Sequence, residues 1–419
     1  MNRWVVIVLL GLSSCKRSTT GAVQAVDASG DASEEAGTVR EARCALVESG
    51  VVLAEGTEAA DLEIGEAVEE TDGIAVGVLR RSGGALVAGV SRVRGGTQRF
   101  VPLGAPLGDA PPPRPFVTRA GLFAAFYGRP SKPTGTRALT FVRFSGEQPS
   151  PVYTLAEQND DSMAFDVAFG DRSGVFAWDE DAIGLRRGNV KVVVLSPEGK
   201  ELRGPRIASP DDTDAERPRV VARRGGFWLV WVARRLEGDE GRDGGHRDEA
   251  PALRRAFEWL EVVALDEGGE AAGPVRRLTS VKGHVSVFDL AVRVGTDTVD
   301  IVARDDDQAV DGAGGRLVRV SVRPDGVEGP TAIVAEVGRG VPDFLVLGTS
   351  TWLFFTEPSD RLRLIPLDAA RIPAASPSLE KALDRGRPLV RLSGRGESRL
   401  LAAFPEDASG QLRTLSCGL

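Results

Sequence analysis

Pairs and triplets of acidic residues recur in the connecting segments of this chain of 419 residues. Clustered carboxylates can bind Ca²⁺, which prefers oxygen ligands, or attract a basic partner over a distance. Two carboxylates held about 5–10 Å apart can also cleave a glycosidic bond. Glu69, Glu70 and Asp72 form one such group. The residues that we select as a candidate binding face are Asp160, Asp161, Asp179, Asp181, Asp211, Asp212, Asp305 and Asp306, with His284 beside them.

Few residues are placed for catalysis. The two histidines, His246 and His284, have no second histidine at the spacing of a zinc site. No Gly-x-Ser-x-Gly elbow, phosphate-binding loop or dinucleotide fingerprint follows a strand. The run Asp305–Asp307 lacks the spaced ligands and terminal glutamate of an EF-hand. We therefore expect no catalytic residue and no cofactor, with Ca²⁺ at the acidic loops as the one open possibility.

Two interpretations of the acidic groups and of His284 remain open. The carboxylates either form a binding face or are a solvated surface that keeps the protein soluble. His284 is either part of that face or a surface histidine with a structural hydrogen bond. The formal net charge is −8, from 60 acidic and 52 basic residues. Such a balance argues against a nucleic acid as the partner.

The elements that would position these residues are short strands. Runs of Val, Leu, Phe and Trp alternate with turn clusters, and no long segment has a helical period. Three segments share one pattern: an apolar strand, a turn with an acidic residue and glycine, and a returning strand that opens with Gly-Pro. These segments begin at Val193, Val263 and Val320.

A second, more apolar hairpin precedes each of these outer hairpins, which gives units of four strands. Seven inner hairpins recur about 40–70 residues apart. Such repetition resembles the blades of a β-propeller, and two packed β-sandwiches are the alternative architecture. The inner hairpins are expected within residues 74–90, 116–127, 164–178, 218–231, 287–302, 344–355 and 389–404.

In a four-stranded blade, the segment entering the inner strand and the segment between strands two and three lie on the same face. The resemblance therefore implies that the acidic groups share one rim of the ring. The final unit shows three strands of its own, so we expect the segment 44–54 to supply the fourth. Cys44 and Cys417 would then be neighbours and form a disulfide that closes the ring.

The beginning of the chain resembles a bacterial lipoprotein precursor. Arg3 precedes an apolar run too short to span a membrane, and Leu12-Ser13-Ser14-Cys15 resembles a lipobox. The resemblance implies a signal peptide over 1–14 and a lipid on Cys15. Residues 15–40 are rich in Ala, Ser, Gly, Asp and Glu and are predicted to be a flexible tether.

These observations predict an all-β protein with a single propeller domain over 41–419, most simply of seven four-stranded blades. The expected location is the cell envelope, with the chain facing the periplasm or the cell surface. Because Lys16 is not aspartate, the lipoprotein sorting rule favours the outer membrane over the inner one. The expected function is non-catalytic binding of a protein or glycan partner by one face of the ring. The alternative is a carbohydrate-active enzyme, a glycosidase or lyase, that uses loop carboxylates.

Overall fold

The structure is a computed structural model of the chain. The chain divides into two compact units, Met1–Glu41 and Ala42–Leu419, and every described residue belongs to the second. The predicted signal peptide, Cys15 and the tether therefore lie outside the described residues. The structure describes residues 43–52, 62–82, 84–95, 97–104, 110–129, 137–150, 153–158, 162–181, 187–235, 257–293, 295–306, 315–338, 341–347, 350–358, 361–367, 378–382, 399–402 and 411–418.

The described strands form antiparallel sheets, most of them four-stranded, and the described residues contain no helix. The first sheet has β2 (Leu62–Glu70), β3 (Gly73–Ser82), β4 (Ala85–Arg94) and β5 (Thr97–Gly104). The second has β6 (Arg114–Thr118), β7 (Gly121–Gly128), β8 (Arg137–Ser145) and β10 (Tyr153–Gln158), with β9 (Gln148–Pro149) paired to β8. The third has β11 (Phe165–Phe169), β12 (Gly174–Asp181), β13 (Gly188–Leu195) and β14 (Glu201–Ile207).

The remaining sheets follow in chain order. The fourth has β15 (Thr213–Arg223), β16 (Gly226–Arg235), β17 (Glu258–Asp266) and β18 (Arg276–Arg277). The fifth has β19 (Val285–Val292), β20 (Val299–Asp306), β21 (Gly315–Arg323) and β22 (Gly326–Val337). The sixth has β23 (Asp343–Leu347), β24 (Ser350–Thr356), β25 (Arg361–Pro366) and β26 (Ser378–Ala382). The last joins β27 (Arg399–Ala402), β28 (Gln411–Gly418) and β1 (Arg43–Val52).

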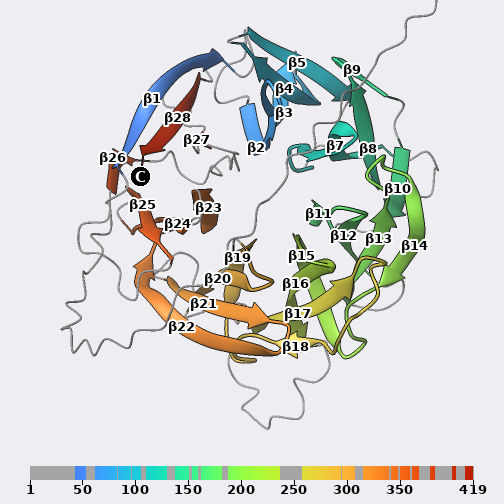
Figure 1. Cartoon of the computed structure of the whole chain (residues 1–419), viewed down its shortest axis with the longest axis vertical. Helices are drawn as coiled ribbons and strands as arrows, with labels where there is room; N and C mark the ends of the chain where they lie inside the picture. The colour runs from blue at the N-terminus through green and yellow to red at the C-terminus, as the bar shows by residue number, and fades with distance from the viewer. Residues whose placement is uncertain are drawn as a thin grey trace, which may run out of the picture. The chain divides into compact units, whose positions relative to one another are not determined.

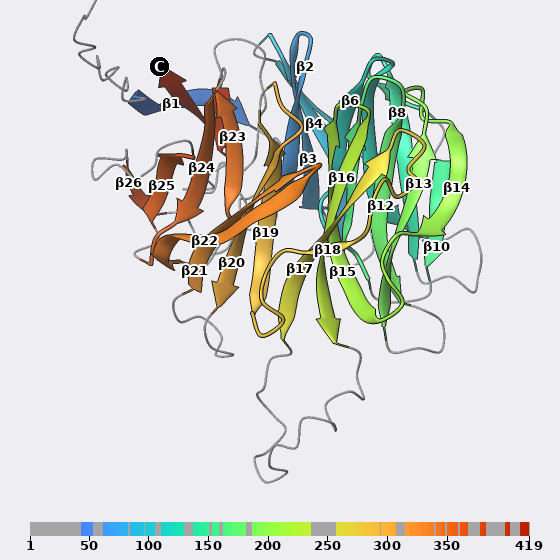
Figure 2. The same ribbon diagram turned by 60° about the horizontal axis from the view of Figure 1, so that its bottom comes forward.

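Within this unit, successive sheets stand side by side around a common centre (Figure 1). The first strand of each complete sheet is the innermost, since β11 contacts β15, β15 contacts β19 and β19 contacts β23. Figure 2 shows the strands of each sheet running from one face of the unit to the other. This arrangement is that of a β-propeller, as the repeat pattern predicts.

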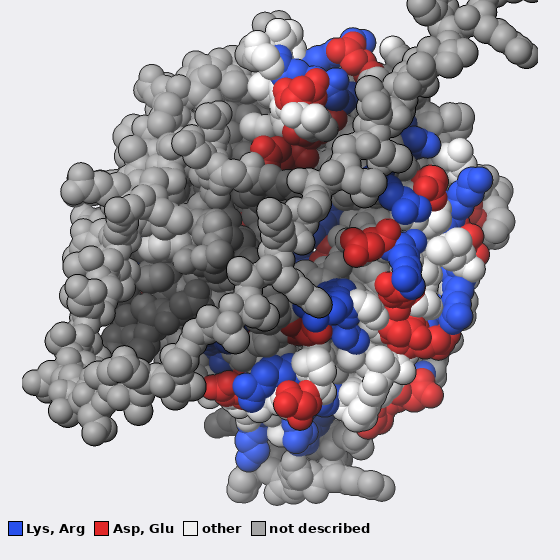
Figure 3. Space-filling model, in the orientation of Figure 1, with Lys and Arg blue, Asp and Glu red and all other residues white. Residues whose placement is uncertain are grey.

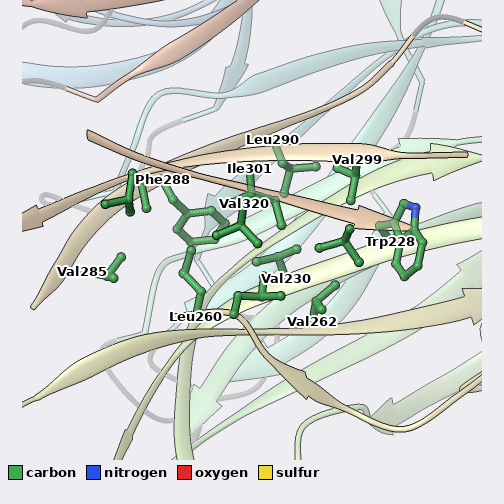
Figure 4. Packing of buried hydrophobic residues seen from close by; sticks show 14 of the residues in the cluster. Trp228, Val230, Leu260, Val262, Val285, Phe288, Leu290, Val299, Ile301 and Val320 are labelled. Carbon is green, nitrogen blue, oxygen red and sulfur yellow. The ribbon is translucent and has the colours of Figure 1, made fainter. Parts of the chain in front are cut away.

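The hydrophobic core lies between neighbouring sheets. Side chains alternate in direction along a strand, so β16 can contribute to two interfaces. Phe227, Leu229 and Trp231 pack toward the third sheet, whereas Trp228 and Val230 pack toward the fifth. Figure 4 shows the second of these interfaces, where Val230 and Leu260 meet Phe288, Leu290 and Ile301. Burial on both faces explains why β16 is apolar almost throughout.

Arginine side chains add a second kind of link between successive sheets. Arg304 Nη1 donates to the carbonyl oxygen of Gly338 at 2.9 Å, and Arg319 Nη1 donates to that of Leu367 at 2.7 Å. Leu367 directly follows β25 of the next sheet, and Gly338, in the connection after β22, donates its N–H to the Thr356 carbonyl of β24 in that sheet. The same type of contact joins Arg92 to Gly146, Arg187 to Asp211 and Arg276 to Arg323. A guanidinium suits this role because it can bind a carboxylate on its own sheet at the same time.

The three outer hairpins form where the repeat pattern predicts them, as β13–β14, β17–β18 and β21–β22. One inner hairpin was predicted wrongly. Residues 74–90 are strands two and three of their sheet, and the innermost strand is β2. Its sequence, LEIGEAVEE, is rich in glutamate and has few large apolar residues. It therefore lacks the apolar signal on which the prediction relied.

The N-terminal strand pairs with the C-terminal one. β1 runs antiparallel to β28, and Cys44 is the register partner of Cys417. The segment 389–392, expected as the inner strand of this unit, lies outside the described residues. Directly opposed residues of an antiparallel pair have Cα atoms about 4.5–5.5 Å apart, which is within the range of disulfides.

Candidate functional site

Acidic residues from both predicted classes of segment, Asp214 and Asp179, lie at the same end of their sheets. The end of β12 lies against the start of β15, because Asp179 Oδ2 accepts a hydrogen bond of 2.8 Å from the Arg217 N–H. In the same region Asp214 Oδ1 accepts one of 2.5 Å from the Gly188 N–H. We call the surface formed by the ends of β12, β16 and β20 and the starts of β15 and β19 the loop face.

The predicted residues differ in exposure across the third and fourth sheets. Asp211 and Asp212 are exposed, as is Asp181 at the end of β12. Arg187 binds both the main-chain carbonyl and the carboxylate of Asp211. Asp179 is buried instead, and its two oxygens accept the N–H groups of Ala164 and Arg217. Asp179 therefore has a structural role, and Asp160 and Asp161 lie outside the described residues.

His284, Asp305 and Asp306 form one local arrangement at the fifth sheet. The His284 N–H donates to Asp305 Oδ1 at 2.9 Å, and the Asp306 N–H donates to the His284 carbonyl at 3.0 Å. Arg316 binds Asp305 Oδ2 at 3.0 Å, and Arg304 binds Asp306 Oδ1 at 2.7 Å. Asp306 is buried. These carboxylates fix the entry to β19 and are neutralised by arginines.

A cluster centred on Arg234 lies at the loop-face end of the fourth sheet. The sequence did not predict it. Arg234 donates to both oxygens of Glu216, at 2.9 and 2.7 Å, and to Glu258 Oε1 at 2.8 Å. Burial raises the pKa of Glu216, although Arg234 opposes this. Burial would lower the pKa of Arg234, but Glu216 and Glu258 outweigh it and raise that pKa. The cluster is a nearly balanced ion-pair network.

A second unpredicted cluster lies among the innermost strands. Arg114 Nη2 lies 2.8 Å from Glu66 Oε2 and 2.7 Å from Asp166 Oδ1. Arg219 in β15 reaches Glu66 in β2 at 3.1 Å, which links the fourth sheet to the first. The Asp166 side chain is only 4% exposed. Burial raises the pKa of Asp166, while Arg114 and Arg219 oppose this effect.

Two inner-strand aspartates repeat the same contact. Asp166 Oδ2 accepts the Val220 N–H of the next sheet at 2.9 Å. Asp289 Oδ2 accepts the Phe344 N–H of its next sheet at 3.2 Å. The surrounding sequences, Phe165-Asp166-Val167-Ala168 and Phe288-Asp289-Leu290-Ala291, share the order Phe, Asp, aliphatic, Ala. This short sequence repeat could have identified the carboxylates of the inner strands.

The opposite face carries the hairpin turns. Glu70 and Asp72 lie in or beside the β2–β3 turn and pair with Arg94, so they belong here and not to the loop face. A shallow groove of about 580 Å³ is lined by Asp171, Arg172, Arg224, Gly225, Asp266, Glu267 and Gly268.

Figure 3 shows one face of the molecule, on which described basic and acidic side chains alternate without a large area of one sign.

No group of three or more His, Cys, Asp or Glu side chains in the described part of the chain is arranged to hold a metal ion. Within the same residues, no helix has the length and apolar character needed to cross a membrane.

Comparison with known proteins supports the fold. No family model matches the chain. No curated protein matches it either. Among solved structures, it is similar to an ulvan lyase of polysaccharide lyase family PL25, with a TM-score of 0.58 and 10% identity over 90% of this chain and 96% of that one.

Two further solved structures are similar over most of their length. One is the hydrazine synthase of Kuenenia stuttgartiensis, with a TM-score of 0.51 and 13% identity over 88% of this chain and 99% of that chain. The other is the β-propeller domain of the trilobed protease from Pyrococcus furiosus, with a TM-score of 0.47 and 10% identity over 86% and 94%. At these identities the likeness concerns the fold alone.

Proposed function

We propose that this chain is a lipid-anchored β-propeller of the bacterial cell envelope that binds a protein or glycan partner through its loop face. The observation that supports binding is how the carboxylates are used. Asp179, Asp166 and Asp305 each have both oxygens engaged by main-chain N–H groups or arginines. Carboxylates held in this way are poorly suited to exchange protons with a substrate, whereas they hold the segments around them rigid, as a binding surface requires.

The proposal includes a closed ring of seven blades. The pairing of β1 with β28 supports it, because a strand shared between the two ends of the chain holds the ring together without a free edge. The register of Cys44 and Cys417 supports a disulfide at this seam. In an exported protein such a bond would form readily.

The anchor and the location rest on the lipobox. Cys15 would carry the lipid, and the segment 15–40 would separate the propeller from the membrane. The outer membrane is the location that Lys16 favours. Nucleic acid has no place in this account because the chain is acidic overall.

Affinity capture with matched charge variants tests this function. The lipidated full chain would be isolated with its partners from membranes after chemical crosslinking. Asp211→Arg with Asp212→Arg reverses two exposed charges on the loop face, and Asp171→Arg reverses one in the groove of the opposite face. We expect the first variant to lose the partner and the second to retain it. Equal recovery with both variants would refute the loop face as the binding surface.

The enzyme alternative has one specific observation in its favour. Arg114 Nη2 lies within 2.8 Å of carboxylate oxygens from both Glu66 and Asp166, so two acidic groups are close together among the inner strands. Glycosidases use such pairs. Release of reducing or unsaturated sugar ends from envelope polysaccharides, abolished by Glu66→Gln, would establish this alternative. Its absence with the binding partner present would exclude it for those substrates.

A further inference from the structure

The rim between the fourth and fifth sheets carries an exposed aromatic side chain beside exposed guanidiniums. Phe257, just before β17, is 44% exposed. Its ring lies against the His284 ring in a tilted arrangement, with ring centroids 5.1 Å apart and an interplanar angle of 30°. Glu258, the next residue, is bridged to His284 through the main chain. An aromatic pair that is not covered by the core presents a flat apolar surface to solvent.

Two arginines bind carboxylates that adjoin this pair, since Glu258 follows Phe257 in the chain and Asp305 accepts the His284 N–H. The Arg217 side chain is 41% exposed and lies 3.9 Å from the buried Glu258 carboxylate. The Arg316 side chain is 42% exposed and lies 3.0 Å from Asp305, which is mostly buried. The solvent-facing part of the patch therefore consists of guanidinium, imidazole and phenyl groups. We call Arg217, Phe257, His284 and Arg316 the rim patch.

The main chain at Arg217 is part of a β-bulge. The pairing of β15 with β16 shifts between Glu216 and Arg219, and Arg217 has φ of +53°, the left-handed region that glycine adopts without strain. Among the described residues it is the one non-glycine residue with positive φ. The bulge places the Arg217 guanidinium near Glu258 on the neighbouring strand β17 of the fourth sheet.

We propose that the rim patch binds a carboxylated sugar residue of a polysaccharide. A pyranose ring has an apolar C–H face that can lie on Phe257, and its equatorial edge carries hydroxyl groups. A carboxylate at that edge would accept charge-assisted hydrogen bonds from Arg217 or Arg316. An acidic peptide offers the carboxylate on a flexible stem without the flat apolar face, so it matches only half of the patch. This inference deepens the proposed function and rests on the loop face being the binding surface.

The test compares a carboxylated saccharide with its uncharged ester and with a second carboxylated saccharide of different sugar composition. Oligogalacturonate, its methyl ester and alginate oligomers would be titrated into the full chain in detergent, with heat of binding as the signal. We expect the two carboxylated oligomers to bind and the ester to bind about tenfold more weakly, the loss of one charge-assisted hydrogen bond. Phe257→Ala and Arg316→Gln should each weaken oligogalacturonate about tenfold as well.

Arg172→Gln is the matched control, because it removes an exposed guanidinium from the opposite face. It should leave the affinity unchanged, and thermal unfolding of every variant would verify that the fold is intact. Equal binding of the ester, no effect of Phe257→Ala, or equal competition by oligoglutamate would each overturn the proposal. If neither oligomer binds while the partner is still captured through Asp211 and Asp212, the sugar site is refuted and the proposed function stands.

Discussion

Cys44 in β1 and Cys417 in β28 are directly opposed residues of one antiparallel pair, although 373 positions separate them in the chain. This register brings the two ends of the domain to one place. If the thiols are oxidised, the bond removes more chain entropy from the unfolded state than a short loop would. The entropy model gives about 5 kcal/mol for a loop of this length, and measured gains are often smaller.

The first prediction concerns this pair. Thiol counting on the exported, denatured chain should give no free thiol from Cys44 or Cys417 without reductant and two after reduction. Reduction or Cys417→Ser should lower the unfolding temperature, and reductant should have no further effect on that variant. Two free thiols in the unreduced protein would rule out the disulfide.

Asp300 is predicted to be the most sensitive charged residue of the fifth sheet. It is fully buried and accepts hydrogen bonds from Arg293, Arg319 and Ser321. Replacing it with alanine leaves Arg293 and Arg319, which are partly exposed, without their buried carboxylate partner, which costs about 3 kcal/mol. Urea unfolding measures this loss. Ser321→Ala removes one neutral donor and should cost only about 1 kcal/mol.

The pH dependence of stability provides a check on Asp300. Burial alone would raise its pKa, but the hydrogen bonds from Arg293 and Ser321 and the charge of Arg319 lower it below the ordinary 3.8. The folded state therefore favours the carboxylate. Its contribution is full above the unfolded pKa and is lost as the pH falls through the folded pKa. In Asp300→Asn, the free energy of unfolding should fall less steeply as the pH is lowered into the acid range. The same pH dependence in the variant and the parent chain would contradict a lowered pKa of Asp300.

Arginine-specific links between sheets are tested at Arg304. It donates to Asp306 in its own strand and to the carbonyl of Gly338, whose N–H in turn binds the Thr356 carbonyl of the next sheet. A lysine cannot make both contacts in the same geometry, so Arg304→Lys should cost about 1–3 kcal/mol. Arg172→Lys at an exposed position should change stability by less than about 0.5 kcal/mol. Similar small losses for both variants would show that any cation suffices.

The left-handed conformation of Arg217 predicts an unusual order of stability. With the side chain removed in both cases, Arg217→Gly should be about 1 kcal/mol more stable than Arg217→Ala, since alanine retains the steric strain. At Arg203, an exposed residue of β14 without positive φ, the order should be reversed. Denaturant unfolding of the four variants measures both differences. The same order at both positions would argue against strain at Arg217.

Strand pattern and turn chemistry made much of the fold predictable from sequence. The run Phe227–Trp231 follows a double-glycine turn, and it is apolar throughout because it is buried on both faces. β2 escaped the same reasoning because its inward side chains include Glu66, which belongs to the inner ion-pair cluster. A polar innermost strand has no distinctive apolar period. That β2 is the innermost strand of the first sheet could be inferred only from its position as the first of four strands, as in the other sheets.

The candidate site was less predictable. Adjacent aspartates indicated which segments share a face, but sequence could not show that Asp179 and Asp306 turn inward to bind main-chain groups and arginines. Contacts such as Arg219 with Glu66 join residues 153 positions apart and depend on how the sheets are placed. The Phe257–His284 pair likewise arises from two sheets. Single charged or aromatic residues carry no signal for such pairing.

Site-specific photocrosslinking in living cells tests directly whether the loop face is the binding surface. A photoreactive amino acid would replace Asp212 on the loop face, and Leu202 on the exposed outer strand β14 would serve as the matched position. We expect a discrete crosslinked product from position 212 and none from position 202. Products from position 202 alone, or the same products from both positions, would contradict it.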